Sequence, residues 1–196
     1  MIKNVIFDCS DTLLHLKAVD YLATLTRDRA RAEHIHKTLF FSEAWWNYDR
    51  GIIDGEAARK SFTALLPPED AETANLYFDN WFLQYEPIEG IPELIKELKE
   101  KGYRLFVLSD FPARFEALWD HYDLFRRFDG RVISYEIGYK KFELKPFEFL
   151  LEKYDLQREE CLFTDDSEIC ITSAKACGIP AHQFVGVADL RRVLGL

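Results

Sequence analysis

The sequence predicts an α/β fold, in which a doubly wound parallel sheet carries a small all-helical cap inserted after the first strand. Three observations lead to this prediction. Short apolar runs alternate with helical patterns near both ends of the chain, as is typical of βαβ units. The segment between them, about 15–87, has a helical pattern throughout and contains no convincing strand. The length of 196 residues allows one well-buried core plus a modest inserted unit.

Five short apolar runs are predicted to form the strands of the sheet. Continuous apolar runs of this length fit strands that are buried on both faces of a parallel sheet. The predicted strands are 4–7, 103–109, 131–134, 161–164 and 181–185.

Three helices are predicted between these strands, at 91–102, 145–156 and 169–179. In the first of them Leu94, Ile95 and Leu98 recur at helical spacing. Pro92 lies in its first turn and Gly102 gives a stop. Strands that alternate with helices of this length imply right-handed crossovers and a doubly wound sheet.

The middle of the chain is predicted to be a helical cap, residues 15–87, between the core segments 1–14 and 88–196. Its predicted helices are 17–40, 41–50, 51–66 and 69–84, with a break at the sequence LPPED. An insertion directly after the first strand is expected to lie over the carboxyl-terminal edge of the sheet. That edge is where open α/β sheets bind their ligands.

The composition argues against several classes of partner. With 48% hydrophobic and 30% charged residues, the chain is typical of a soluble globular protein. The net charge of −9 argues against a nucleic-acid surface, because binding a phosphodiester backbone needs clustered Lys and Arg. No apolar run approaches the roughly 18 residues of a membrane span, and no leader precedes the first strand. The four cysteines have no metal-site spacing. We therefore expect a cytoplasmic monomer or homodimer with free thiols.

Polar side chains follow the predicted strands at the points where the strands end. In chain order they are Asp8, Ser109 and Asp110, then Lys140, Lys141 and Lys145, and finally Asp165 and Asp166. In a doubly wound sheet these strand ends converge on one crevice. Carboxylates packed together repel one another and raise each other's pKa. A hard divalent cation relieves this conflict, so the sequence predicts a Mg²⁺ site with room for a phosphate.

Four segments resemble the motifs of the haloacid dehalogenase-like (HAD) hydrolases, in their usual order. They are FDCSDTLL, VLSD, GYKKFELKPFEFLLEKYDL and FTDDSEICITSAKACGI, and together with the cap the resemblance covers essentially the whole chain. The cap phrase WWNYDRGIIDGEAARKSF, together with DDS, is similar to bacterial sugar-phosphate phosphatases of the α-glucose-1-phosphatase type. The resemblance implies a Rossmann-like core and a Mg²⁺-dependent hydrolase of a small phosphorylated metabolite, with a sugar phosphate as the first expectation.

The resemblance also implies roles for individual residues. Asp8 matches the nucleophile, which attacks phosphorus to give an aspartyl-phosphate that water then hydrolyses. The backbone carbonyl of Ser10 and the carboxylate of Asp166 match metal ligands, and Asp165 is a candidate for a second metal-directed carboxylate of motif four. Ser109 matches the hydroxyl that hydrogen-bonds the transferring phosphoryl group. Asp110 and, from the cap, Arg50 are further candidates for substrate binding.

Motif three offers two lysines for one role. The family pattern places Gly, Lys and Phe at a spacing that Gly138, Lys141 and Phe147 match, with Phe142 in place of the usual proline. The literal Lys-Pro dipeptide begins four residues later, at Lys145. We favour Lys141, whose charge would offset that of the phosphate, and keep Lys145 as the alternative.

Ser10 departs from the most frequent form of motif one. The family usually carries there a second Asp, which protonates the leaving oxygen and later activates water. A serine hydroxyl titrates far above neutral pH, and losing a general acid costs roughly 10²–10⁴-fold in rate. Asp11 is one residue further along and is expected to point elsewhere. A leaving group of low pKa would need less protonation and would still be released.

Two other functions remain open from the sequence. One is a metal-independent haloacid dehalogenase, because a departing halide needs no proton. The other is a degenerate, non-catalytic HAD-fold protein that binds a ligand or a protein through its aromatic cap. The aromatic residues of the cap are interpreted first as its core and second as a substrate pocket. They are Trp45, Trp46, Tyr48, Phe62, Tyr77, Phe78, Trp81 and Phe82.

Overall fold

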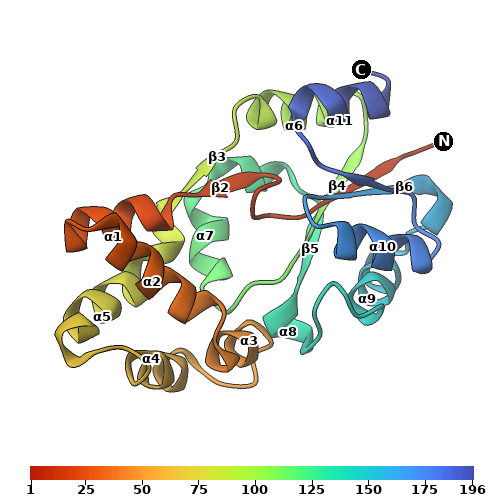
Figure 1. Ribbon diagram of the computed structural model, residues 1–196. Helices are drawn as coiled ribbons and strands as arrows, with labels where there is room; N and C mark the ends of the chain where they lie inside the picture. Colours follow the sequence, from red (N-terminus) through yellow and green to blue (C-terminus); the bar gives the residue numbers. More distant parts are fainter.

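A five-stranded parallel sheet forms the centre of the molecule, and the computed structural model describes residues 1–196 (Figure 1). The strand order is β5-β4-β1-β6-β7. The strands are β1 (Asn4–Phe7), β4 (Arg104–Ser109), β5 (Gly130–Ile133), β6 (Cys161–Asp165) and β7 (Ala181–Gln183). Phe7, the last residue of β1, pairs with Val107 on one side and Thr164 on the other, so neighbouring strands end close together. The predicted α/β class with a parallel sheet is confirmed.

Helices cover both faces of this sheet, because its strands are apolar on both sides. Val5 and Phe7 of β1 pack on α6 (Ile91–Glu100), α7 (Phe115–His121) and α11 (Val187–Leu194). Ile6, which points to the opposite face, packs with α9 (Lys145–Tyr154) and α10 (Glu168–Ala176). Figure 1 shows α6 and α11 on one side of the sheet and α9 and α10 on the other. The helices α7 and α11 were not predicted.

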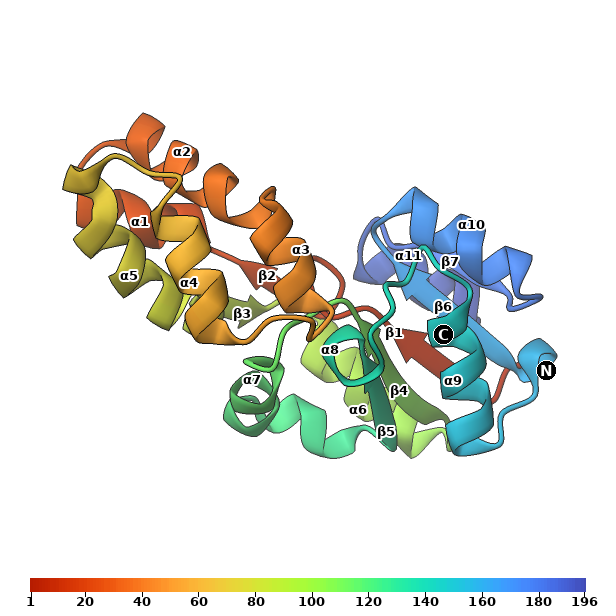
Figure 2. The ribbon, with the colours of Figure 1, turned by 90° about the horizontal axis from the view of Figure 1, so that it is seen from below.

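Five helices lie together beyond the carboxyl-terminal edge of the sheet (Figure 2). They are α1 (Ala18–Thr26), α2 (Arg29–Phe40), α3 (Glu43–Asp49), α4 (Gly55–Thr63) and α5 (Ala71–Asn80). Asp28, Ser42 and Asp54 each accept a hydrogen bond from the backbone three residues on, and so begin α2, α3 and α4. The helical pattern predicted over 17–40 is confirmed, but it is divided into two helices, because Arg27 has φ of 56° and Asp28 caps a new helix.

A two-stranded antiparallel ribbon lies where the chain passes between the sheet and these helices. It consists of β2 (Leu14–Leu16) and β3 (Tyr85–Pro87). The prediction that 15–87 contains no strand is therefore wrong. Strands of three residues have no readable period, and their pairing joins segments far apart in the sequence. The boundaries of the cap at 15 and 87 stay a prediction, and the ribbon spans both of them.

The remaining elements are short. They are α8 (Ser134–Ile137) and four 3₁₀ segments, η1 (Pro68–Asp70), η2 (Trp81–Gln84), η3 (Asp123–Arg127) and η4 (Arg158–Glu160). None of the helices combines the length and the apolar character that crossing a membrane requires.

Candidate active site

Asp8, Asp165 and Lys141 meet at the carboxyl-terminal edge of the sheet. Asp8 directly follows β1, and its backbone N–H donates to the carbonyl of Thr164 on β6. The Nζ atom of Lys141 lies 2.6 Å from Asp8 Oδ1 and donates to Asp165 Oδ2 at 2.6 Å. All three side chains are buried. A lysine between two carboxylates in a buried place is costly unless the three are paired, and here they are.

The loop after α8 brings Lys141 to this position. Gly138, with φ of 77°, ends α8 in the left-handed conformation that favours glycine. The backbone N–H of Lys141 then donates to Asp110 Oδ1 at 3.0 Å. Lys145 lies at the start of α9, is exposed and pairs with Glu148 at 3.2 Å. The structure thus brings Lys141 and not Lys145 to Asp8, while the role of Lys141 in the reaction stays a prediction.

Three carboxylates of the site are placed as ligands of one metal ion would be. One oxygen each of Asp8, Asp165 and Asp166 lies within 4.8 Å of the others. Asp165 is also fixed by the backbone N–H of Ser167, which donates to its Oδ1 at 2.8 Å. When all three are ionised, one lysine leaves an excess of two negative charges, and an all-oxygen cluster is what Mg²⁺ prefers. The residues therefore fit the divalent cation expected from the sequence.

Burial controls the ionisation of the site. Loss of water raises the pKa of Asp8 to about 7, the charge of Lys141 opposes this rise, and Asp165 adds to it. Burial also works against the charge of Lys141, but Asp8 and Asp165 outweigh it and raise the pKa of the lysine well above its ordinary value. A carboxylate is a nucleophile only when it is ionised. Asp8 therefore depends on the positive charge of Lys141 to stay ionised and nucleophilic.

The other predicted residues lie around this centre. Ser109 is the buried last residue of β4, the strand next to β1. The hydroxyl of Ser10 lies 2.7 Å from the hydroxyl of Tyr85 on β3. The carboxylate of Asp11 is exposed and lies 2.7 Å from His15, and its expected orientation away from the site stays a prediction.

A buried ion pair joins the helical cap to the loop of Lys141. Lys140 Nζ donates to Asp49 Oδ2 of α3 at 2.8 Å, and both side chains are nearly inaccessible to solvent. Ser134 Oγ donates to the carbonyl of Asp49 at 2.6 Å. Arg50, predicted to bind substrate, donates instead to the carbonyl of Gly138 at 3.0 Å, so its substrate contact stays a prediction. Sequence reasoning missed Asp49 and the role of Lys140, because no local pattern marks a pair so far apart in the chain.

Breaking this pair is expected to destabilise the fold. Asp49→Leu or Lys140→Met alone should lower the free energy of unfolding by about 3–5 kcal/mol, because each leaves one buried charge unpaired. The double variant should recover most of the loss, since it buries no charge. Denaturant unfolding of the two single variants and the double variant measures this, and additive losses would contradict the account.

The pH dependence of the Lys140→Met variant is a second readout. Burial raises the pKa of Asp49 to about 6 even with Lys140 present. A group whose pKa is raised on folding takes up its proton more readily in the folded state, so stability falls as pH rises. Lys140→Met should therefore gain stability as the pH is lowered from 7 to 5. Asp49→Leu lacks this carboxyl group and should gain less, because only groups common to both variants, such as Asp8 with its raised pKa, still contribute.

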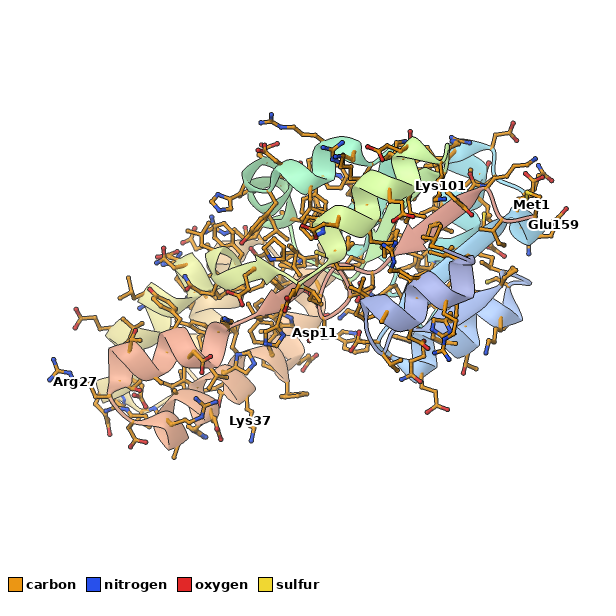
Figure 3. The ribbon with its side chains drawn as sticks, turned by 90° about the horizontal axis from the view of Figure 1, so that it is seen from above. Met1, Asp11, Arg27, Lys37, Lys101 and Glu159 are labelled. Carbon is orange, nitrogen blue, oxygen red and sulfur yellow. The ribbon has the colours of Figure 1, made fainter.

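A cavity of about 360 Å³ lies between the cap and the sheet, and we call it the cap cavity. Ser10 and Asp110 line it on the side of the candidate catalytic residues, Asp11 and Asp49 add two further carboxylates, and aromatic side chains of α2, α3, η2 and β3 line much of the rest. Figure 3 shows Asp11, another lining residue, at the junction of the two parts of the molecule, far from Arg27 on the cap and from Met1 on the core. A hollow of about 510 Å³ around Met1, at the opposite edge of the sheet, contains none of the candidate catalytic residues.

Two solved structures share this fold. The HAD family enzyme BT-2542 from Bacteroides thetaiotaomicron, in complex with magnesium and inorganic phosphate, has a TM-score of 0.71 and 20% identity, covering 93% of this chain and 94% of that one. The L-2-haloacid dehalogenase from Xanthobacter autotrophicus has a TM-score of 0.74 and 19% identity, covering 100% of this chain and 83% of that one. The fold alone thus does not distinguish a phosphate-binding protein from a dehalogenase.

Sequence comparison gives the family. The sesquiterpene phosphatase astK of Aspergillus oryzae is 25% identical over 163 residues, which cover 81% of this chain and 83% of that protein. The model of the haloacid dehalogenase-like hydrolases matches residues 2–178. That match spans β1, the cap, and the segments that contain Asp8, Lys141 and Asp165. The chain therefore belongs to the haloacid dehalogenase-like hydrolases.

Proposed function

We propose that the protein is a Mg²⁺-dependent phosphatase that hydrolyses a small phosphate monoester through a phosphoryl-Asp8 intermediate. The observation that carries the proposal is the buried Lys141, held between Asp8 and Asp165 and close to Asp166. Such a centre has positive charge for a phosphate and carboxylates for a cation, whereas a metal-independent dehalogenase has no need of the acidic cluster. The similarity to a sesquiterpene phosphatase also favours phosphate ester hydrolysis.

In the proposed reaction Asp8 Oδ attacks phosphorus, the P–O bond to the alcohol breaks, and an acyl phosphate forms on Asp8. Water then attacks the same phosphorus, which releases inorganic phosphate and restores the carboxylate. Lys141, fixed by Asp165 and Asp110, keeps a positive charge beside Asp8 throughout. Asp8, Asp165, Asp166 and the carbonyl of Ser10 would hold Mg²⁺, which supplies further charge neutralisation for the phosphoryl group.

Removal of the metal tests this proposal. With Mg²⁺ present, we expect hydrolysis of members of a panel of phosphate monoesters. This activity should disappear when EDTA is added and return with excess Mg²⁺. Phosphate release measured by a colorimetric assay is the readout. Release of halide from a 2-haloacid in the presence of EDTA would instead support a dehalogenase. A panel without turnover would support a non-catalytic binding protein.

Ser10 limits the leaving groups that the site can release. Its hydroxyl is bound to Tyr85, whose pKa burial raises well above 10, so neither group exchanges protons readily near neutral pH. Ser10→Asp places a carboxyl group where the usual acid stands. We expect this variant to hydrolyse alkyl phosphates, which have poor leaving groups, about tenfold or more faster. Aryl phosphates, whose leaving groups need little protonation, should change little.

Comparing kcat on methyl phosphate and phenyl phosphate for wild type and Ser10→Asp measures this difference. Ser10→Asn is the matched control, because its side chain has the same size and no acid. A gain in both variants would contradict the interpretation, and so would a gain in neither.

A further inference from the structure

We infer that the cap cavity binds an apolar group of the substrate, so that the preferred phosphate monoesters carry a hydrocarbon and not a polyhydroxylated group such as a sugar. This inference rests on the proposed function for the phosphate end of the ligand. It concerns only the group attached to that phosphate.

The walls of the cap cavity are aromatic rings that support one another. Trp81 packs against Trp45 at 4.9 Å between ring centroids and against Phe111 at 5.1 Å. Phe40 packs on Trp45 at 4.1 Å. Trp45, Trp81, Tyr85 and Phe111 are all nearly inaccessible to solvent, so these faces have fixed positions. Fixed aromatic faces favour a ligand that loses apolar surface to them.

The polar side chains in these walls have partners already. Ser10 is bound to Tyr85, Asp11 to His15, and His36 to the hydroxyl of Tyr77 at 2.7 Å. A sugar brought into this space would place hydroxyls against the aromatic walls, and hydroxyls buried there without partners are costly.

Two lining carboxylates are also engaged at the catalytic side of the cavity. Asp49 is paired with Lys140, and Asp110 accepts the backbone N–H of Lys141. The buried wall atoms without a hydrogen-bond partner are Asp49 Oδ1, close to the Trp45 indole, and Trp81 Nε1. The wall formed by Phe40, Trp45, Trp81 and Phe111 offers only indole N–H groups as partners for ligand hydroxyls.

The position of the cavity connects it with the reaction. Two of its lining residues are next to the catalytic residues in the chain. Ser10 lies two residues after Asp8, and Asp110 directly follows Ser109. An ester whose phosphorus lies at Asp8 would therefore extend its other group into the cavity. A volume of about 360 Å³ is within the range of sites for small molecules, which is roughly 300–1,000 Å³. Phe41, the most exposed of the lining aromatics, stands at its mouth.

A pair of aryl phosphates tests the inference while the chemistry stays constant. The esters 4-butylphenyl phosphate and 4-(3-hydroxypropyl)phenyl phosphate are nearly equal in size and in leaving-group pKa, and they differ by one terminal hydroxyl. With Mg²⁺ we expect kcat/KM to be at least about tenfold higher for the butyl ester. Equal values, or a preference for the hydroxylated ester, would overturn the inference and leave the phosphatase proposal standing.

Variants of two exposed phenylalanines locate the effect. Phe41→Ser at the mouth of the cavity should reduce the preference for the butyl ester at least threefold. Phe149→Ser on α9, the same change at a less exposed phenylalanine outside the cavity (41% exposed against 84% for Phe41), should keep the wild-type preference. An equal loss in both variants, or no loss in either, would overturn the assignment to the cap cavity.

Binding separates failure of this inference from failure of the proposed function. Calorimetry with Asp8→Asn and each ester needs no turnover. Tighter binding of the butyl ester supports an apolar cavity even if wild type hydrolyses neither ester, in which case the phosphatase proposal alone fails. Equal binding of the two esters, or no binding of either, overturns the inference.

Discussion

Asp8→Asn is expected to abolish phosphate release, with kcat lowered by at least about 10³-fold. The amide has almost the shape of the carboxylate but is not a nucleophile, so the covalent route through Asp8 is closed. Lys141 keeps its partner Asp165 in this variant, so the fold is expected to be retained. Steady-state kinetics with the best ester of the panel, together with circular dichroism of the variant, measure both effects.

Asp155→Asn is the matched control for this change. Asp155 is exposed, ends α9 with φ of 51° and lines the hollow around Met1, at the edge of the sheet opposite the site. Asn tolerates that conformation well. Activity within about twofold of wild type is expected for Asp155→Asn. Retention of activity in Asp8→Asn would show that the reaction does not use Asp8 as its nucleophile.

Lys141→Met is expected to lower kcat by about 10²–10³-fold, as the loss of one preorganised charge at a reacting group typically does. Lys145→Met, the same change at an exposed lysine, should leave activity within about twofold of wild type. Phosphate release at saturating ester compares the two variants. A loss only in Lys145→Met would refute the choice of Lys141.

Stability gives an independent readout of the same lysine. Without Lys141, Asp8 and Asp165 face each other without a positive charge, so one of them is expected to take up a proton. Lys141→Met should therefore unfold at a lower temperature than wild type, and Mg²⁺ should raise its unfolding temperature. An unfolding temperature equal to that of wild type without metal would show that Lys141 does not hold these carboxylates together.

The sheet and its acidic edge were predictable from local patterns. Apolar runs marked the strands, and the position of Asp8 directly after the first run was enough to place it at the edge of the sheet. The choice between Lys141 and Lys145 needed the spacing from Gly138. The structure adds a reason for this choice. The backbone N–H of Lys141 donates to Asp110, which holds the loop at the site, whereas Lys145 is the exposed first residue of α9.

Contacts between distant segments were not predictable. The β2–β3 ribbon has three residues on each side and no period to read. The pair of Asp49 with Lys140 joins the cap to the core, and no spacing rule applies to it. Arg50 was a reasonable candidate for substrate binding as a cationic cap residue, but its guanidinium is bound to the carbonyl of Gly138.

The aromatic cap was only half interpretable from the sequence. Composition favoured a core over a pocket, yet Trp45 and Trp81 are buried and also line the cap cavity. The sequence does not show which face of an aromatic side chain is packed in the core and which face lines a cavity. The expectation of a sugar phosphate came from resemblance and stays a prediction, whereas the aromatic walls favour an apolar ester.

The measurement that tests the central claim most directly is mass spectrometry of the protein quenched in acid during turnover of the best ester. The account predicts one added phosphoryl group on the peptide that carries Asp8, removed by hydroxylamine and absent from Asp8→Asn. A phosphoryl group on another residue, or turnover without any covalent adduct on Asp8, would contradict it.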